Sequence, residues 1–348
     1  MKRKDFNRLL LLSAAGGLAS CVTPKGKAGS HGNFSSKIIK PPKLKKGDTV
    51  GLIAPGSHFS ADAYKRTLEN LEKLGLKFKN ATNLFKKYGY VAGSDKERLD
   101  DIHQMFADPE VKAIWCVRGG YGTTRLLYDL DYELIRHNPK IIAGYSDITA
   151  LLNAIFKKTG LVTFHAPVGS SKMNEYTFDN FKKILMEGDK PGIKIHNYTF
   201  DNDAPEYRKY VITEGDMTGR LAGGNLTLLA AIAGTPYQLD AKDKIVFIED
   251  IEEKPYRIDR MLTQLIQTSK LETAAGILLG IFKGCDAEGD NTLRLHETLK
   301  DRLAPLGIPV FYGFAFGHVE AMCTLPVGIK AHFDYRKEEL TLLENAVS

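Results

Sequence analysis

Apolar segments of strand length alternate with amphipathic helical segments through the first half of the sequence. The apolar segments are DTVGLIAPGS (48–57), VKAIWCV (111–117), KIIAG (140–144) and LVTFHAP (161–167). The helical segments between them are 60–75, 94–108 and 147–160, and the first two begin with a serine as the expected N-cap. Alternating strands and helices form βαβ units, in which the crossover helix makes neighbouring strands run parallel. The sequence therefore predicts an α/β fold with a mostly parallel sheet flanked by helices.

This pattern resumes after a polar, turn-rich stretch in the middle of the chain. Between 171 and 215 the apolar periodicity weakens, so we interpret this stretch as an inter-domain connection. Further strands are expected in IVFI, AAGILLGIF and PVFYGFAFGH, and a β-ribbon in TLPVGIKAHFDYRKEELTLL. We predict an N-terminal α/β domain over 47–170 and a smaller C-terminal α/β domain with the β-ribbon over 216–348.

The first 21 residues have the composition of an export signal. Four basic residues and one acidic residue precede the apolar run LLLLSAAGGLAS, and Cys21 follows. A basic head, a short apolar core and small residues are typical of a signal peptide, and the run is too short to cross a bilayer. LASC also resembles the lipobox of bacterial lipoproteins, in which the cysteine is lipidated and becomes the N-terminus. We predict a lipoprotein-type signal peptide over 1–21 and an exported, membrane-anchored protein on the periplasmic or cell-surface side.

Two alternatives remain open for this terminus. It could be an ordinary signal peptide that ends near a cysteine, and RKDF weakly resembles a twin-arginine motif with Lys4 in place of the second arginine. The next stretch, 22–46, is rich in Gly, Ser, Pro and Lys, so we interpret it as a flexible tether. Residues 1–20 contribute +3 to the formal net charge of +6, and the remaining +3 is too weak to indicate nucleic acid binding.

The remaining cysteines suggest neither a metal site nor a disulfide framework. Cys116, Cys285 and Cys323 are odd in number, and none belongs to a CxxC pair. Cys116 lies inside the apolar segment AIWCV. We interpret all three as small buried hydrophobic residues, and we expect no metal and no cofactor.

Polar residues follow several expected strands at their carboxyl ends, where open α/β sheets bind ligands. These candidates are Ser57, the Gly119-Gly120 loop, Ser146 with Asp147, His165, Glu249 with Asp250, and His318. An exported hydrolase without a metal site most simply combines a nucleophile, a base and an orienting acid. Residues of all three types are present among the candidates.

Ser146 lies at the junction of an expected strand and an expected helix, in AGYSDITALL. A tight turn there would project the side chain out of the sheet and aim the free N–H groups of the helix start at a substrate. G-Y-S-D has the first glycine of the nucleophile-elbow motif but lacks the second. From this stretch alone, the simpler interpretation is that Ser146 or Asp147 only caps the helix.

The other candidates also have structural alternatives. Glu249 follows IVFI and could orient a histidine or belong to a solvated acidic turn. His165 and His318 both end apolar segments, and each could be a hydrogen-bonded structural histidine. RGGYG (118–122) lacks the Gly-Lys-Ser/Thr ending of a P-loop, so an oxyanion-hole loop suits a hydrolase better.

Seven segments taken together resemble the LD-carboxypeptidase family of serine peptidases, which includes the microcin-C self-immunity peptidases. They are VGLIAPGS, CVRGGYGTTRLL, AGYSDITALL, TFHAPV, GRLAGGNLTLLAAIAGTPY, IVFIEDIEEKPYRIDRML, and FAFGH followed by TLPVG. The resemblance covers residues 47–340. The resemblance departs at TFHAPV, where family members more often have Gly-Pro-Met. The differing residues, Ala166 and Val168, affect what the resemblance implies about the substrate pocket and leave the nucleophile unchanged.

The resemblance implies a Ser–His–Glu triad of Ser146, His318 and Glu249, with the chain order of the family kept. The implied oxyanion hole consists of three backbone N–H groups, those of Asp147, Gly119 and Gly120. The resemblance further implies two domains, catalysis without a cofactor and a homodimer.

We therefore expect a serine carboxypeptidase that cleaves the amide bond to a terminal D-amino acid, such as the D-Ala of a murein tetrapeptide, through an acyl-enzyme on Ser146. One alternative is the same triad acting on a peptide-nucleotide antibiotic. Residues 165–215 would decide between the two substrates. A second alternative is a surface-anchored binding protein without turnover, against which the complete residue set argues.

Overall fold

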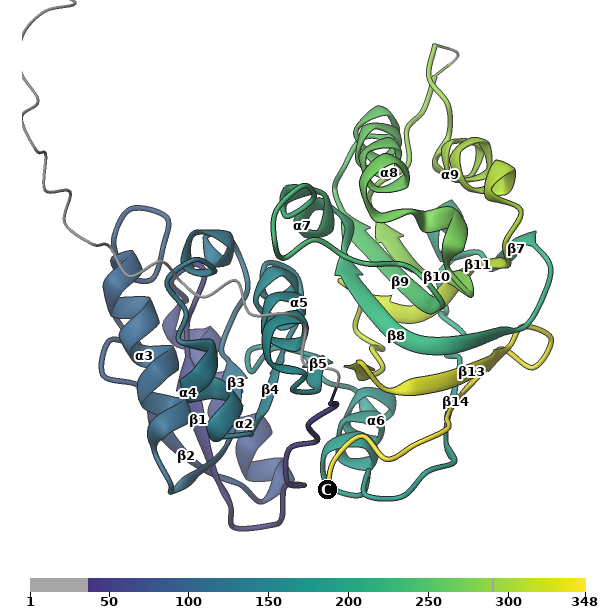
Figure 1. Ribbon diagram of the computed structural model, residues 1–348. Coiled ribbons are helices and arrows are strands. Elements are labelled where there is room, and N and C mark those ends of the chain that lie inside the picture. The colour runs from purple at the N-terminus through teal and green to yellow at the C-terminus, as the bar shows by residue number, and fades with distance from the viewer. Residues whose placement is uncertain (1–36, 290) are drawn as a thin grey trace, which may run out of the picture. The chain divides into compact units, whose positions relative to one another are not determined.

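The computed structural model describes residues 37–289 and 291–348, which form two β-sheets with helices (Figure 1). The predicted signal peptide with Cys21 and the tether residues 22–36 lie outside the described part. No helix within that part is long and apolar enough to cross a membrane.

The predicted tether is not flexible over its last ten residues. The Ile39 N–H donates to Gly160 O at 2.8 Å, and the Leu44 N–H donates to Leu185 O at 2.9 Å. The Leu44 side chain is buried in the main core. The prediction is therefore wrong for 37–46, because apolar residues among the lysines attach this stretch to the protein.

The first sheet has six strands in the order β12-β5-β4-β3-β1-β2. All neighbouring pairs are parallel except β12 with β5. The strands are β1 (Thr49–Ile53), β2 (Lys77–Asn80), β3 (Val111–Cys116), β4 (Ile141–Gly144), β5 (Thr163–His165) and β12 (Leu325–Val327). The prediction of a mostly parallel sheet is confirmed, and the antiparallel edge strand comes from the C-terminal part of the chain.

Helices flank this sheet, as the alternating pattern predicts (Figure 1). They are α2 (Ala61–Leu74), α3 (Asp95–Ala107), the short η1 (Thr123–Leu126), α4 (Tyr132–His137) and α5 (Ile148–Thr159). Ser60 Oγ accepts a hydrogen bond from the Ala63 N–H at 3.2 Å, and Ser94 forms a capping box with Glu97. These two caps are the signals that predict where α2 and α3 begin.

The segment expected to be only a connection contains regular structure. It includes α6 (Glu175–Leu185), β6 (Ile193–His196), η2 (Pro205–Tyr207) and β7 (Tyr210–Thr213). Strands β6 and β7 form the two opposite edges of the second sheet. Most of their side chains are not buried, so the strands lack the apolar periodicity from which a strand is predicted.

The second sheet has eight strands in the order β6-β14-β13-β8-β9-β10-β11-β7. Its other strands are β8 (Met217–Asn225), β9 (Lys244–Ile251), β10 (Gly276–Lys283), β11 (Val310–Gly317), β13 (Lys330–Asp334) and β14 (Glu339–Leu342). Strands β8 to β11 are parallel, and β13 pairs with β14 as the predicted antiparallel ribbon.

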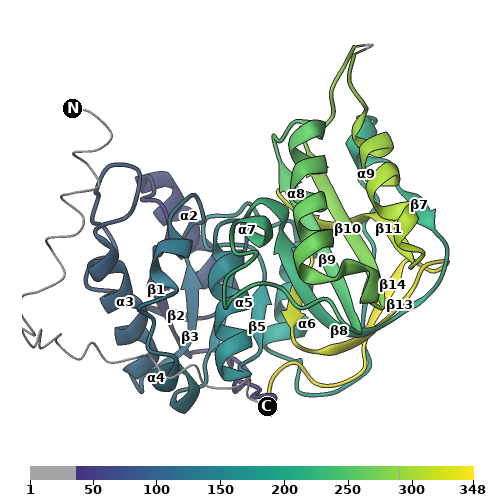
Figure 2. The ribbon, with the colours of Figure 1, turned by 45° about the horizontal axis from the view of Figure 1, so that its top comes forward.

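Helices α8 and α9 lie side by side on one face of the second sheet (Figure 2). The helices of this half are α7 (Leu226–Ala231), α8 (Pro255–Ser269), η3 (Leu271–Thr273), α9 (Leu295–Leu303) and η4 (Ala304–Leu306). Val246 and Ile248 of β9 pack toward these helices, whereas Ile245 and Phe247 join the core of the first sheet. Because alternate residues of a strand face opposite sides, Glu249 lies on the face of β9 that meets the first sheet.

Helix α5 contacts both sheets, and a pair of glycines in β8 permits this close approach. The Asn153 Nδ2 donates to Gly223 O at 2.9 Å. A Cβ added to Gly224 would lie only 2.5 Å from Thr149 Oγ1. The glycines of the GRLAGGN segment thus let the helix that follows Ser146 pack directly on the strand beside β9.

Candidate active site

Ser146 occupies the turn between β4 and α5 with a left-handed backbone, at φ 63°. This conformation costs a non-glycine residue about 1–2 kcal/mol, so the surrounding fold must hold it in place. Space for the turn comes from Gly144 and Gly119, where an added Cβ would lie 3.0 Å from Ile148 and 3.1 Å from the Ser146 Cβ. A strained serine between a strand and a helix is typical of a nucleophile elbow, although the motif is incomplete here.

Ser146, His318 and Glu249 form one continuous hydrogen-bonded chain. The distance from His318 Nε2 to Ser146 Oγ is 3.1 Å, and that from His318 Nδ1 to Glu249 Oε2 is 2.8 Å. With the proton on Nδ1 donated to Glu249, Nε2 presents a lone pair to the serine hydroxyl. Glu249 is fully buried, whereas 15% of the His318 side chain is exposed. This geometry suits a nucleophile, a general base and an orienting acid.

Gly317 allows the end of β11 to approach Glu249. Its φ is 113°, and an added Cβ would lie 3.0 Å from both the Cβ and Oε2 of Glu249. Any larger residue there would therefore push against the carboxylate that holds His318.

Glu249 and His318 each stabilise the charged form of the other. Burial alone would raise the pKa of Glu249, but the adjacent His318 keeps that pKa below its ordinary value. Burial alone would lower the pKa of His318, but the Glu249 charge and hydrogen bond raise it above its ordinary value. The pair therefore favours the imidazolium that forms when His318 takes a proton from a serine.

The Gly119-Gly120 loop at the end of β3 lies against Ser146. The Ser57 N–H donates to Gly119 O at 3.0 Å, and the Tyr121 N–H donates to Ser57 Oγ at 3.1 Å. Gly120 has φ 101°, and a Cβ there would lie 2.5 Å from Ser57 Oγ. Ser57 thus holds this loop in place, and only glycine fits at 120.

Asp147 does not cap α5 with its side chain, so the simple capping interpretation is wrong for this residue. Its buried carboxylate instead accepts a hydrogen bond from the Thr123 N–H at 3.0 Å, while Thr123 Oγ1 donates to Asp147 O. Burial raises the pKa of Asp147 above its ordinary value. Within the described residues, no acceptor meets the Asp147 N–H, which lies next to Ser146 in the chain. This N–H is therefore available to an oxyanion.

Two further candidates lie beside the triad without joining it. His165 is fully buried at the end of β5. Asp250 accepts hydrogen bonds from Asn225 Nδ2 at 3.0 Å and from Thr227 Oγ1 at 2.9 Å, on the opposite face of β9 from Glu249. Asp250 thus supports the start of α7.

Sequence reasoning missed two residues at this site, Asn225 and Tyr145. Asn225 pairs in register with Glu249 and contributes to the lowered pKa of that carboxyl group. Its N-cap position before an apolar helical segment was a usable signal. The Tyr145 ring centroid lies 4.9 Å from that of His318, a contact that no local pattern indicates.

The cysteines and acidic residues provide no metal centre in the part of the chain that the structure describes. No group of three or more His, Cys, Asp or Glu side chains there could hold a metal ion. Cys116, Cys285 and Cys323 are free and buried, which confirms their interpretation as small buried residues. Burial raises the pKa of each thiol, that of Cys285 to about 12.

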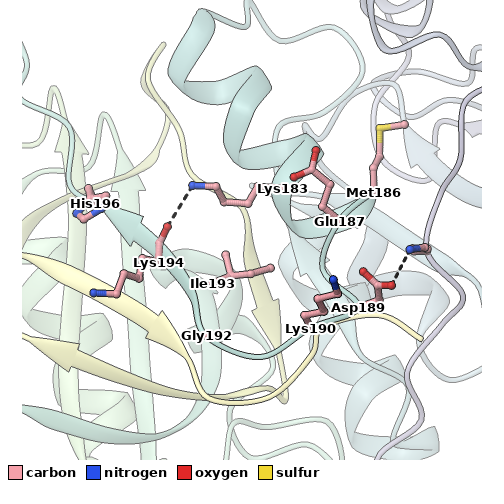
Figure 3. Close-up of a pocket in the computed structure, with 10 residues that line it drawn as sticks. Lys183, Met186, Glu187, Asp189, Lys190, Gly192, Ile193, Lys194 and His196 are labelled. Carbon is pink, nitrogen blue, oxygen red and sulfur yellow. Dashed lines mark hydrogen bonds and ion pairs between the residues drawn. The ribbon is translucent and has the colours of Figure 1, made fainter.

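A surface groove lined by residues near α6 and β6 contains none of the triad (Figure 3). Lys43 Nζ lies 2.6 Å from Asp189 Oδ2, and Lys183 Nζ donates to Lys194 O at 3.4 Å. Outside the groove lining, Glu339 Oε1 lies 2.9 Å from Lys194 Nζ. These contacts engage Lys43, Asp189, Lys183 and Lys194 with their neighbours, and the groove is not part of the Ser146–His318–Glu249 arrangement.

Comparisons with known proteins match both halves of this arrangement. Residues 50–166 match the family model described as the LD-carboxypeptidase N-terminal domain, and 218–333 match the LD-carboxypeptidase C-terminal domain. The first range contains Ser146, and the second contains Glu249 and His318. A protein of Bacillus subtilis (strain 168), named probable murein peptide carboxypeptidase, is 41% identical over 315 residues, which cover 89% of this chain and 95% of that protein.

Two solved structures resemble the fold over most of its length. The muramoyltetrapeptide carboxypeptidase from Oxalobacter formigenes has a TM-score of 0.75 and 32% identity, covering 86% of this chain and 100% of that chain. The structure of MccF in complex with glutamyl sulfamoyl guanosine has a TM-score of 0.80 and 28% identity, covering 89% and 99%.

Proposed function

The chain belongs to the LD-carboxypeptidase family of serine peptidases, and from this premise we propose that it releases the terminal D-Ala of murein tetrapeptides. The observation that carries the proposal is the hydrogen-bonded chain from Ser146 through His318 to Glu249. The names of the Bacillus subtilis relative and of the Oxalobacter formigenes structure support a murein peptide as the substrate.

The triad would act through an acyl-enzyme. His318 Nε2 takes the proton of the Ser146 hydroxyl as Oγ attacks the carbonyl carbon of the scissile amide, and Glu249 stabilises the resulting imidazolium. The N–H of Asp147 and those of the Gly119-Gly120 loop face the developing oxyanion. Each such donor is worth about 3–4 kcal/mol in the barrier.

The tetrahedral intermediate then collapses, and His318 returns the proton to the leaving nitrogen. The C–N bond breaks and D-Ala departs, leaving the shortened peptide as an ester of Ser146. Water attacks this ester with His318 again as base, which releases the product and restores the serine hydroxyl.

A carboxypeptidase must also bind the free carboxylate of its substrate, and we propose Lys283 for this role. Lys283 ends β10, which lies between β9 and β11. Its register partner is Ile251, two residues after Glu249, so Lys283 shares the sheet face of Glu249. Its charge acts on His318, lowering the pKa of that ring. No acidic side chain in 37–289 or 291–348 pairs with it.

Replacement of the nucleophile tests the proposal. We expect Ser146→Ala to lower D-Ala release from purified murein tetrapeptide by about 10⁴-fold or more. Ser269→Ala is the matched control, because Ser269 Oγ is buried without a partner among the described residues and lies in α8. Undiminished release by Ser146→Ala would exclude the triad assignment.

A second candidate substrate is a peptide-nucleotide antibiotic, which the likeness to MccF with glutamyl sulfamoyl guanosine favours. The same triad would cleave it, so only the substrate differs. Parallel assays on murein tetrapeptides and acyl-sulfamoyl adenylates separate the two. If neither is cleaved and a fluorophosphonate fails to label Ser146, a binding protein without turnover becomes the better account.

We further propose that the protein is exported, anchored to a membrane by lipid on Cys21, and homodimeric. The lipobox-like LASC segment supports the anchor, and the family resemblance supports the dimer. Cys21→Ala should abolish labelling by a palmitate analogue and move the protein to the soluble fraction. Sedimentation of the protein without residues 1–21 tests the dimer, and a concentration-independent monomer would exclude it.

A further inference from the structure

His165 is a fully buried histidine that the triad does not use. It ends β5, where it pairs in register with Gly144 of β4 and Leu325 of β12. Its exposure is 0%, and neither Nδ1 nor Nε2 has a hydrogen-bond partner within the described chain. Buried polar groups are almost always hydrogen-bonded, so two such atoms on one ring call for a specific explanation.

The His165 ring packs on the same surface of the second sheet as the Glu249–His318 pair. Its centroid lies 5.3 Å from that of Phe247 and 6.0 Å from that of Phe316. Phe247 stands two residues before Glu249, and Phe316 two residues before His318. Since side chains two residues apart along a strand share a face, Phe247 and Glu249 lie on the same face of β9, and His165 packs on that face.

Tyr145 connects the two histidines. Its ring centroid lies 6.1 Å from that of His165 and 4.9 Å from that of His318. The titratable groups around His165 are therefore Tyr145, Glu249 and His318. Burial lowers the pKa of His165 to about 4 against the opposing effect of the Glu249 charge. At neutral pH the ring is uncharged and has one N–H donor and one acceptor nitrogen.

Glu249 has a matching unpaired atom. Its Oε2 binds His318, but its Oε1 is buried without a hydrogen-bond partner among residues 37–289 and 291–348. The nearby Asn225 side chain contributes to the lowered pKa of Glu249, but its Nδ2 donates to Asp250 Oδ1 at 3.0 Å. The described part of the chain thus contains, on one face of β9, a buried carboxylate oxygen without a donor and a buried imidazole whose N–H has no acceptor.

We propose that His165 is a positioning residue for Glu249, to whose Oε1 its imidazole donates an N–H through one buried water. A single buried water with two or more polar partners is a common solution for such groups. This contact would fix the carboxylate plane so that Oε2 faces His318. The inference rests on the proposed function of the triad and adds a residue to which the family resemblance assigns no role.

His165→Phe removes the donor and keeps a planar ring. We expect kcat for D-Ala release to fall about tenfold with KM within twofold, as for outer hydrogen-bond partners that orient a site. The acidic limb of the kcat/KM profile should shift to lower pH, because a misplaced Glu249 no longer raises the pKa of His318 against the lowering effects of burial and of Lys283. Asp250, the other charge that acts on His318, also raises that pKa. His165→Gln, which keeps an N–H donor, should recover part of the loss.

Phe247→Leu is the control for packing, since it disturbs the surroundings of His165 without removing a polar atom. Equal loss and equal pH shift in Phe247→Leu and His165→Phe would overturn the proposal, as would a folded His165→Phe enzyme with unchanged kcat and unchanged acidic limb. If His165→Phe does not fold, ¹⁵N-histidine spectra of wild type and Glu249→Gln decide. The His165 nitrogens should shift in Glu249→Gln, and unchanged signals would contradict the proposed hydrogen bond.

The rate at which a fluorophosphonate labels Ser146 provides a readout that does not depend on the substrate. Slower labelling in His165→Phe supports the positioning role even if wild-type enzyme fails to release D-Ala, an outcome that would reject only the substrate. Labelling at the wild-type rate in folded His165→Phe would reject the positioning role and leave the proposed function intact.

Discussion

The backbone N–H of Asn225 donates a hydrogen bond to Thr149 Oγ1 at 3.0 Å. Thr149 lies in the first turn of α5, three residues after Ser146, and Asn225 is the β8 residue in register with Glu249. This one contact therefore joins the nucleophile turn to the strand pair that carries the acid. It gives a physical reason why Ser146 and the Glu249–His318 pair meet at hydrogen-bonding distance.

Gly224→Ala should disturb this junction. The new Cβ would lie 2.5 Å from Thr149 Oγ1 and Cγ2, and such overpacking typically costs about 1–3 kcal/mol. We expect a lower free energy of unfolding in urea and a lower kcat, because α5 must move away from β8. Gly234→Ala is the control, since Gly234 also has a positive φ (81°) but open space around its Cα. Equal losses in both variants would attribute the effect to backbone conformation alone.

Glu249→Gln should change the pH dependence of catalysis as well as its rate. Burial lowers the pKa of His318, and the Glu249 charge more than compensates, so the net pKa lies above the ordinary value of about 6.5. His318 must be neutral to accept the serine proton, so activity is lost as pH falls through this pKa. In Glu249→Gln the acidic limb of kcat/KM should move to lower pH, with kcat reduced about 10⁴-fold. A limb that stays in place would assign the titration to another group.

Asp147→Asn should loosen the Gly119-Gly120 loop, whose N–H groups belong to the proposed oxyanion hole. The carboxylate that accepts the Thr123 N–H would be replaced by an amide with one fewer acceptor oxygen. Removal of one oxyanion donor costs about 10²–10³-fold in kcat, so a displaced loop should cost roughly tenfold or more. Steady-state kinetics should show this loss in kcat with little change in KM. The exposed Asp62 of α2, changed to Asn, is the control and should leave both parameters unchanged.

Lys283→Met should weaken the binding of the terminal carboxylate. A hydrogen bond to a charged group contributes about 1.5–3 kcal/mol, which corresponds to a KM increase of roughly tenfold or more. A tetrapeptide with a C-terminal amide provides the sharper comparison. Wild type should discriminate against the amide, whereas Lys283→Met should treat both substrates alike. Lys300→Met, on the exposed side of α9, is the control, and full discrimination by Lys283→Met would place the carboxylate elsewhere.

Local sequence signals were sufficient to predict most of the first sheet and its helices. The N-caps at Ser60 and Ser94 and the apolar runs of β1, β3 and β4 act over a few residues, so the sequence shows them directly. The edge strands β6 and β7 escaped prediction because most of their side chains are not buried. The packed stretch 37–46 was not predicted either, because its many lysines and prolines are typical of a tether, although its Leu44 is buried.

The sequence by itself determined which residue types stand at the ends of the strands, since strand periodicity and turn composition are local properties. It also determined the chain order of Ser146, Glu249 and His318, on which the family resemblance rests. Only the tertiary structure decided that Ser146 Oγ and His318 Nε2, 172 positions apart, lie 3.1 Å from each other. It likewise decided that the Asp147 carboxylate binds the Thr123 N–H instead of capping its own helix. Both outcomes depend on how α5 packs between two sheets, and such packing is set by contacts between residues that are distant in the chain.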